Sequence, residues 1–333
     1  MKMKPDETPL SLLDLVTIGE GHSISEALET STRLAQAAEQ AGYLRYWVAE
    51  HHNLIDIASA APPVVLSHIG AKTSSIRLGS GGIMLPNHAP LMVAEQFGTL
   101  ESLYPGRIDL GLGRAPGTDM ATARALRRDL CANGLDFSNM VEELMNYFVP
   151  AKPGQRIKAI PGAGLNIPVW LLGSSTYSAL LAAEKGLPLA FASHFAPDSM
   201  SAAIDLYRAS FQPSEQLDKP YVIVCVNAVA ADTQKEAEYL ATTELQKFLN
   251  LGRGVNSLLP KPVEDMSALW QGTEAQRVLR QLRESAWGAP EQVCDKLHDL
   301  VLRTGADEVM LNSWIHDPNA RIHSYELIAN AWF

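Results

Sequence analysis

The chain lacks an excess of basic residues and lacks long apolar runs. It has 27 Lys and Arg against 37 Asp and Glu among 333 residues, a formal net charge of −10 at pH 7. This acidic balance argues against nucleic acid or a membrane surface as the main partner. The sequence contains no run of roughly 18 apolar residues, the length needed to span a bilayer, and the opening MKMKPDETP lacks the apolar core of a signal peptide. We therefore expect a cytoplasmic protein.

Cysteine is scarce, and several motifs of metal and dinucleotide sites are missing. The cysteines are an odd number at wide spacings, which indicates neither a disulfide framework nor a metal knuckle: Cys131, Cys225 and Cys294. No HExxH pattern occurs, and adjacent His51 and His52 diverge on an extended strand, so we predict no metal site. The glycines at 111–117 depart from the GxGxxG fingerprint, and Pro116 interrupts the helix start, which disfavours a nicotinamide dehydrogenase.

Short apolar runs alternate with helical patterns along the chain. Eight runs are typical of buried strands: residues 10–18, 45–49, 76–85, 108–112, 169–172, 189–192, 222–226 and 308–311. Helical patterns between most of them favour parallel βαβ units. Because no composition break marks a linker, we predict one α/β domain over residues 1–333, a (β/α)8 TIM barrel. An open doubly wound sheet is the alternative.

Two stretches exceed ordinary loop lengths and are predicted to be insertions, approximately 114–135 and 240–285. Insertions in a barrel usually lie over the C-terminal mouth, where function resides. Both are therefore candidates for a lid over a site at that mouth.

The densest polar cluster is Glu50, His51 and His52, directly after the second predicted strand. Barrel enzymes draw catalytic side chains from the C-terminal ends of their strands. Imidazole titrates near neutral pH and can move protons in either direction. A structural turn with hydrogen-bonded histidines is the alternative interpretation.

Glycine interrupts the third predicted strand at Gly79, Gly81 and Gly82. Each glycine weakens a strand by roughly 0.5–1 kcal/mol relative to alanine, so a reason is expected. Close approach of a flat ligand to the backbone is one reason, and a β-bulge is the other.

Small hydroxyl residues follow the fifth predicted strand in the run GSSTYS at 173–178. Such a turn exposes backbone N–H groups at a helix N-terminus, a ready site for phosphate, although a plain serine N-cap is the alternative. Arg114, after the fourth strand, adds a fixed cation at the barrel mouth. Together they predict a dianion site.

These segments, in this order, resemble the bacterial luciferase-like family of flavin-dependent monooxygenases. The resemblance is carried by GYLRYWVAEHHN (42–53), IRLGSGGIMLPNHAPLMVAEQF (76–97), LYPGRIDLGLGRAPGTD (103–119) and IPVWLLGSSTYSALLAAEKGLP (167–188). It is weaker at FASHFAP (191–197) and at the C-terminal strand and helix. It implies a barrel that binds reduced flavin mononucleotide (FMN) at its C-terminal mouth.

Position by position, the resemblance implies roles for the residues of the mouth. His51 matches the family's catalytic histidine, and Glu50 matches an acidic residue beside the flavin. Gly81 and Gly82 match a pair joined by a non-proline cis peptide bond under the isoalloxazine ring. The resemblance also implies a phosphate site. Arg114 matches its arginine, Gly173 and Ser174 match its turn, and Ser175 and Ser178 match the pair of hydroxyl residues that closes it.

The implied function is an FMN-dependent monooxygenase that takes reduced FMN from a separate reductase and oxygenates a small organic substrate with dioxygen. His51 would act as general acid or base. The luciferase α subunit has a reactive cysteine where this chain has Gly113, so the chain has less reason to emit light, and a long-chain aldehyde is not assumed as its substrate. The pocket wall is predicted to include several apolar side chains: Trp47, Ile83, Met84, Leu85 and Trp314.

Two other functions remain open. A related branch of the same fold uses a deazaflavin (F420) for hydride transfer, and some family members are non-catalytic flavin-binding subunits. The resemblance also implies a homodimer, formed through the predicted helices at 63–71 and 91–104.

Overall fold

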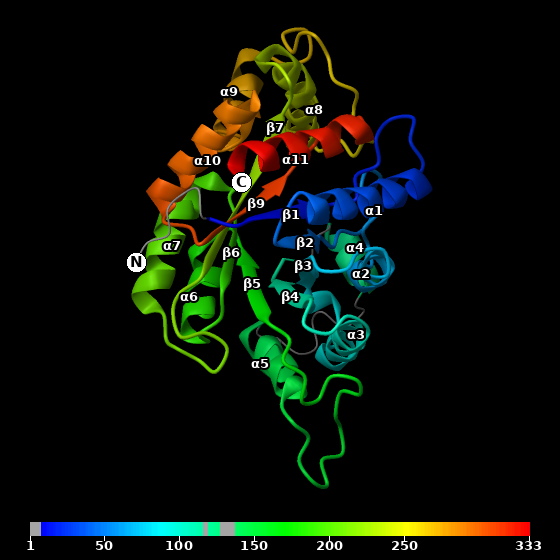
Figure 1. Ribbon diagram of the computed structural model, residues 1–333, viewed down its shortest axis with the longest axis vertical. Helices are drawn as coiled ribbons and strands as arrows, with labels where there is room; N and C mark the ends of the chain where they lie inside the picture. Colours follow the sequence, from blue (N-terminus) through cyan, green and yellow to red (C-terminus); the bar gives the residue numbers. More distant parts are fainter. Residues whose placement is uncertain (1–7, 116–118, 127–136) are drawn as a thin grey trace.

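Eight parallel strands close into a barrel in the computed structural model, which describes residues 8–115, 119–126 and 137–333 (Figure 1). The order around the barrel is β1–β2–β3–β4–β5–β6–β7–β9, and β9 pairs with β1 to close it. The strands are β1 Leu10–Asp14, β2 Arg45–Val48, β3 Arg77–Met84, β4 Ile108–Gly113, β5 Val169–Gly173, β6 Leu189–Ala192, β7 Val222–Ala230 and β9 Glu308–Asn312. The predicted TIM barrel and all eight predicted strands are therefore confirmed.

Helices follow the strands and surround the barrel (Figure 1). They are α1 Ile24–Gln40, α2 Pro62–Gly70, α3 Pro90–Leu103, α4 Met120–Leu126, α5 Phe137–Phe148, α6 Thr176–Glu184, α7 Met200–Ser210, α8 Gln234–Arg253, α9 Gly272–Gln281, α10 Pro290–Thr304 and α11 Pro318–Trp332. Two short 3-10 turns, η2 Leu85–Asn87 and η3 Pro197–Ser199, follow β3 and β6. No helix in the described part of the chain has the length and apolar character needed to cross a membrane.

Local sequence signals explain where several helices begin. At α1, the Ser23 hydroxyl accepts a hydrogen bond from the Glu26 amide, and the Glu26 carboxylate accepts one from the Ser23 amide. This reciprocal capping satisfies two amides that the helix leaves free. Proline opens α2, α3, α10 and α11, where its missing N–H costs nothing and its φ suits the first turn.

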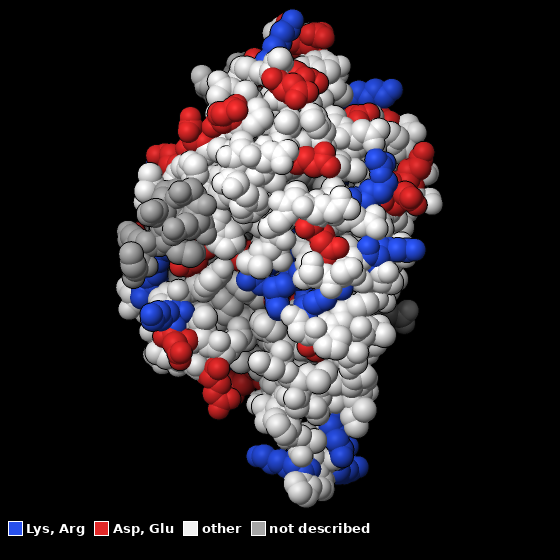
Figure 2. All heavy atoms as spheres, in the orientation of Figure 1, with Lys and Arg blue, Asp and Glu red and all other residues white. Residues whose placement is uncertain are grey.

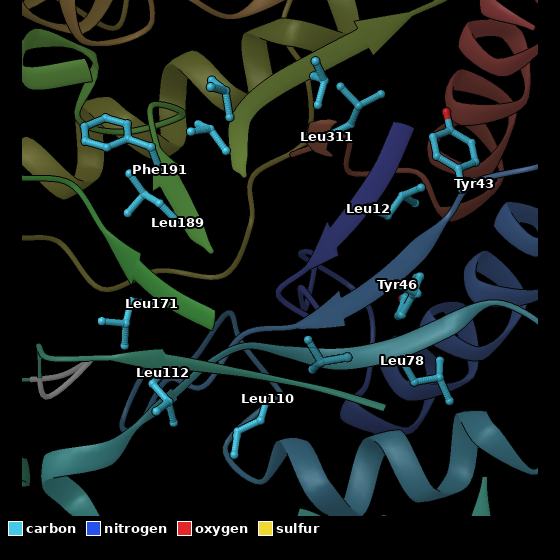
Figure 3. Packing of buried hydrophobic residues seen from close by; sticks show 14 of the residues in the cluster. Leu12, Tyr43, Tyr46, Leu78, Leu110, Leu112, Leu171, Leu189, Phe191 and Leu311 are labelled. Atoms are coloured by element: carbon cyan, nitrogen blue, oxygen red, sulfur yellow. The ribbon is translucent and has the colours of Figure 1, made fainter. Parts of the chain in front are cut away.

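Successive side chains along the strands point to opposite faces of the sheet and so form two separate buried layers. Leu12 and Tyr46 belong to a layer between the strands and the helices, while their neighbours Leu13 and Trp47 belong to a cluster inside the barrel. Figure 3 shows residues of the outer layer, such as Leu12, on neighbouring strands. Because both faces of every strand are covered, the strands consist of apolar runs.

Two features of the fold were not predicted. A short strand, β8 (Ala286–Gly288), pairs with the C-terminal part of β7 outside the barrel order. Residues 149–168, between α5 and β5, form an extended segment at the lower end of the molecule (Figure 1). This segment carries three basic residues and no acidic residue, and basic atoms mark the same tip in Figure 2.

The predicted insertion at 240–285 includes the last part of α8, a loop and α9. Hydrogen bonds tie this region to loops that follow β1 and β2: the Glu20 amide donates to the Leu259 carbonyl at 2.9 Å, and Asn256 donates to the Asn53 carbonyl at 3.2 Å. The region therefore lies on the C-terminal side of the barrel. The other predicted insertion, 114–135, falls largely outside the described residues.

Candidate active site

A cavity of about 250 Å³ lies at the carboxyl ends of the barrel strands. Every barrel strand or the loop directly after it contributes to its lining. All the site residues predicted from the sequence line it except Glu50: His51, Gly81, Gly82, Arg114, Gly173, Ser174, Ser175 and Ser178. Trp47 and Met84 also line the cavity, whereas Ile83, Leu85 and Trp314 are not among its described lining residues.

The floor of the barrel is a buried network of charged residues at the other ends of the strands. Arg45 pairs with Glu308 and with Asp109, each at 2.9 Å, and both carboxylates are fully buried. The indole of Trp47 donates to Asp109 at 3.2 Å, and the Arg45 guanidinium lies 4.7 Å from the Trp170 ring centroid. This network holds Trp47, and through it one wall of the cavity, in a fixed position.

Glu50 lies behind the cavity wall as a fully buried hydrogen-bond acceptor. Its Oε1 lies 2.7 Å from His52 Nε2 and 2.8 Å from His88 Nε2, and its Oε2 accepts the Met84 amide at 2.9 Å. Burial alone would raise the pKa of Glu50, but the bonds from His88, His52 and Met84 outweigh it and lower the pKa. Glu50 therefore stays ionised and fixes the end of β3 against the loop after β2.

The partnership of Glu50 with His88 was not predicted, because 38 residues separate them in the chain. The potential ligand atoms of Glu50, His52 and His88 lie within 4.8 Å of one another, so this group has the composition of a metal site. Both imidazole nitrogens contact the same carboxylate oxygen at hydrogen-bond distance. The two contacts form a hydrogen-bond network around Glu50.

His51 is held at the cavity by its own backbone. The His51 amide donates to the Ser59 carbonyl at 3.0 Å, and the Ser59 hydroxyl donates to the Ala49 carbonyl at 2.5 Å. These contacts fix the chain on both sides of Glu50, so the side chains of residues 50 and 51 diverge. Glu50 is buried behind the wall, and His51 lines the cavity.

Gly81 and Gly82 form part of the cavity surface where β3 shifts register against β4, between Ser80 and Ile83. The peptide bond between the two glycines is cis, as the family resemblance implied. A Cβ atom on Gly82 would lie 2.7 Å from the Gly111 carbonyl oxygen. Only glycine fits this approach of β3 to β4, and it leaves bare backbone facing the cavity. The register shift bears out the β-bulge considered for these glycines, and the close approach of a flat ligand stays a prediction.

The turn after β5 forms a polar corner of the cavity. The hydroxyls of Ser174, Ser175 and Ser178 make no hydrogen bond with another described residue. Ser175 is the N-cap of α6. A Cβ on Gly173 would lie 2.3 Å from the Ser178 hydroxyl, so glycine is needed for this tight turn. The free hydroxyls and the helix N-terminus make this corner suitable for a phosphate.

Arg114 completes that corner from the neighbouring strand end. Its guanidinium lies 4.2 Å from the centroid of the Tyr177 ring, and the side chain is exposed. The ring restricts the guanidinium without neutralising it. A phosphate would therefore meet hydroxyl donors, helix amides and one cation at a single corner of the cavity.

His194, just after β6, also lines the cavity and was assigned no role from the sequence. Burial lowers the pKa of His194 to about 3; a hydrogen bond with the Cys225 backbone opposes this shift, and nearby His51 adds to it. In the barrel order β6 lies opposite β2, so the two histidines face the cavity from opposite sides. The only available signal was its position after a strand, shared with His51.

We expect acid titration to identify His194 as a group that stays neutral in the folded protein. Its pKa of about 3 lies below the ordinary value of 6.5, so between these pH values the unfolded chain binds more protons than the folded chain. This group therefore favours unfolding increasingly as the pH falls from 6.5 toward 3. Relative to wild type, His194→Phe should gain unfolding free energy over that interval, measured by urea denaturation at several pH values.

The control is His323→Phe, which removes a half-exposed histidine from α11. Measured in the same pH series, it separates a gain that is specific to His194 from the effect of removing any histidine. An NMR titration that places the pKa of the His194 imidazole near 6.5 would contradict the assignment.

A closed parallel barrel with its cavity at the carboxyl ends of the strands is the arrangement of TIM-barrel enzymes, and the corner after β5 adds a place for an anionic group. Within that class, the chain belongs to the luciferase-like monooxygenase family, whose model matches residues 9–308. The family predicted from the sequence is thereby confirmed.

Known proteins resemble the chain over nearly its whole length. A luciferase-like monooxygenase of Escherichia coli (strain K12) is 51% identical over 317 residues, which are 95% of each chain. The N-acetyl-S-alkylcysteine monooxygenase of Bacillus subtilis (strain 168) is 32% identical and covers 97% of both chains. The crystal structure of apo-MsnO8 superposes with a TM-score of 0.86 at 34% identity, covering 98% of each chain.

More distant structures share the fold alone. The oxygenating constituent of 3,6-diketocamphane monooxygenase, in complex with FMN, has a TM-score of 0.72 at 17% identity, with 97% of each chain covered. An F420-dependent secondary alcohol dehydrogenase has a TM-score of 0.68 at 14% identity, covering 99% of this chain and 100% of its own. The fold therefore accommodates both flavin and deazaflavin.

Proposed function

We propose that this chain is an FMN-dependent monooxygenase that uses dioxygen and reduced FMN, supplied by a separate reductase, to oxygenate a small organic substrate. The observation that carries the proposal is the polar corner after β5, where Ser174, Ser175 and Ser178 line the cavity with Arg114 and their hydroxyls make no hydrogen bond with another described residue. A phosphate monoester fits this donor set. The complex of a related barrel with FMN supports the choice of cofactor.

Each part of the cavity has a role in this proposal. When bound, reduced FMN supplies the electrons that activate dioxygen for oxygen transfer to an organic substrate. Arg114 and the three serines would hold the phosphate, and the bare backbone of Gly81 and Gly82 would contact the flavin ring. His51 exchanges a proton with the reacting groups. Glu50 does not touch them and acts by positioning the end of β3.

The walls of the cavity exclude water from the reaction. Leu13, Trp47, Met84, Leu172 and Met310 supply much of its lining, and most of the lining surface is apolar. A dry site strengthens electrostatic contacts and suppresses side reactions with water. The loop after α8 and helix α9, on the same side of the barrel, act as the lid.

We further propose that the chain is one domain and forms a homodimer through α2 and α3. These helices expose large apolar side chains: Val64 is 70% exposed, Leu103 55% and Met92 43%. Burial of apolar surface is the main driving force for association. A mass of one protomer in light scattering would exclude the dimer.

The phosphate corner is tested by flavin binding. Arg114→Ala combined with Ser178→Ala should raise the Kd for FMN at least about 100-fold, since each of the two lost charge-assisted hydrogen bonds contributes about 1.5–3 kcal/mol. Riboflavin, which lacks the phosphate, should bind wild type and variant equally well. Both Kd values can be measured by flavin fluorescence quenching.

A matched control is Arg156→Ala, which removes an exposed arginine from the extended segment 149–168. It should change neither affinity. Equal losses for FMN and riboflavin would place the phosphate elsewhere, and preferential binding of F420 over FMN would favour the hydride-transfer alternative. The N-acetyl-S-alkylcysteines on which the B. subtilis relative acts are the first compounds to assay as substrates.

A further inference from the structure

A second cavity, about 390 Å³ and open to solvent, adjoins the first on the side of β6. One wall is the segment 195–199 after β6, and the other is α9, through Arg277, Arg280 and Gln281. Phe195 lines both cavities. Phe195 is 43% exposed, and its ring contacts His194 edge-on, with ring centroids 4.8 Å apart. A ligand that fills the first cavity beside Phe195 can therefore extend into the second.

The face that α9 presents to this cavity is polar and positively charged. Arg277, Arg280 and Gln281 are spaced i, i+3 and i+4, which places them on one face of the helix. The Gln281 amide donates to the Phe195 carbonyl at 3.1 Å, and Arg280 pairs with Asp198 at 2.9 Å. These two contacts hold α9 beside the loop after β6, so Arg277 and Arg280 lie at the edge of the C-terminal mouth of the barrel.

The positive charge of this face is only partly neutralised. Asp198 is shared between Arg280 and Arg283, so one carboxylate serves two guanidinium groups. Arg277 makes no ion pair with any residue that the structure describes. Its Nη1 reaches the Gly252 carbonyl at 3.4 Å. The acidic neighbour on its own helix, Glu274, pairs with Arg253 at 2.8 Å and interacts with Arg277 only at longer range.

Gly252 gives Arg277 the room for this position. A Cβ at residue 252 would lie 2.2 Å from Arg277 Nη2, so a larger residue would displace the guanidinium. The chain thus keeps a cation with unused donors beside the first cavity, although its net charge is −10. A guanidinium binds a carboxylate with two parallel hydrogen bonds.

We infer that the substrate is an organic anion with an apolar body. Its carboxylate binds Arg277 and Arg280, and its apolar part passes Phe195 into the first cavity. This inference rests on the proposed function, in which the first cavity holds the flavin and the reacting end of the substrate. The apolar side chains of segment 195–197, Phe195, Ala196 and Pro197, match such a body.

Binding of matched acids and amides tests the inference without turnover. We would titrate the protein, with FMN present, with 4-phenylbutanoate and 4-phenylbutanamide, and with straight-chain acids of four to ten carbons and their amides, by calorimetry. Wild type should bind at least one acid about tenfold more tightly than its amide, in line with a charge-assisted contact. Arg277→Gln combined with Arg280→Gln should abolish this preference and leave amide binding unchanged.

Two controls separate this inference from the proposed function. Arg156→Gln, the same exchange on the distant segment 149–168, should keep the preference for the acid. The Kd for FMN should be the same in all variants, so failure of FMN binding is a separate result that concerns the first cavity. Absence of any acid preference across the series, or a preference that survives in the double variant, would overturn the inference.

Discussion

His51→Ala is expected to bind FMN with wild-type affinity and to lose about 10²–10⁴-fold in the rate of substrate oxygenation, the usual contribution of a positioned general acid or base. The side chain lines the cavity, while its backbone is fixed by the bond from its amide to Ser59. Truncation therefore removes the imidazole without disturbing the wall. The measurement is single-turnover product formation by mass spectrometry after reduced enzyme-bound FMN is mixed with substrate and dioxygen.

The matched control is His323→Ala, since His323 is a half-exposed histidine of α11. It should keep the wild-type rate. His194 does not replace His51 in this role, because burial lowers its pKa to about 3, so near neutral pH its ring is neutral and is a weak base. If His51→Ala bound FMN and retained the full rate, the histidine would have no catalytic role. If wild type bound FMN and oxygenated none of the compounds assayed as substrates, the result would favour the alternative that the chain is a non-catalytic flavin-binding subunit.

The strands of the barrel could be predicted because their surroundings are simple. Parallel strands covered on both faces need apolar side chains at nearly every position, and β7, buried along its whole length, illustrates this. By contrast, β8 has three residues and pairs with β7 alone. Such a strand forms only through its pairing with β7. Its three residues, Ala286–Gly288, are too few to show the alternation of apolar and polar residues that is typical of a strand.

The candidate site was predictable where its residues follow their strands directly. His51, Arg114 and the serine turn occupy the carboxyl ends of β2, β4 and β5, and the barrel brings these ends together. The contacts between distant segments could not be predicted in the same way. The second cavity depends on pairs such as Arg280 with Asp198, which lie 82 residues apart. These residues come into contact only because α9 packs beside the loop after β6.

Glu50→Ala is expected to lower the free energy of unfolding by about 3 kcal/mol near neutral pH. The change removes one carboxylate that accepts three hydrogen bonds, and the Met84 amide is left in a partly buried place without its acceptor. A buried donor that loses its partner costs about 1–3 kcal/mol, and bonds to a charged group contribute more than neutral ones. Urea denaturation followed by circular dichroism measures the loss. Because Met84 lines the cavity, FMN affinity should also fall.

The dependence of this effect on pH separates the charge of Glu50 from its shape. Hydrogen bonds lower the folded-state pKa of Glu50 below its ordinary value of 4.5, so the folded protein binds fewer protons here than the unfolded chain as the pH falls below 4.5. The stabilisation is therefore complete above the unfolded pKa and is lost as the pH falls through the folded pKa. Glu50→Gln, which keeps the shape and one acceptor, should be less stable than wild type at pH 7, and the difference should narrow in acid. A difference that stayed constant from pH 7 to pH 3 would mean that the carboxylate acts through packing alone, and the end of β3 would then be held by other contacts.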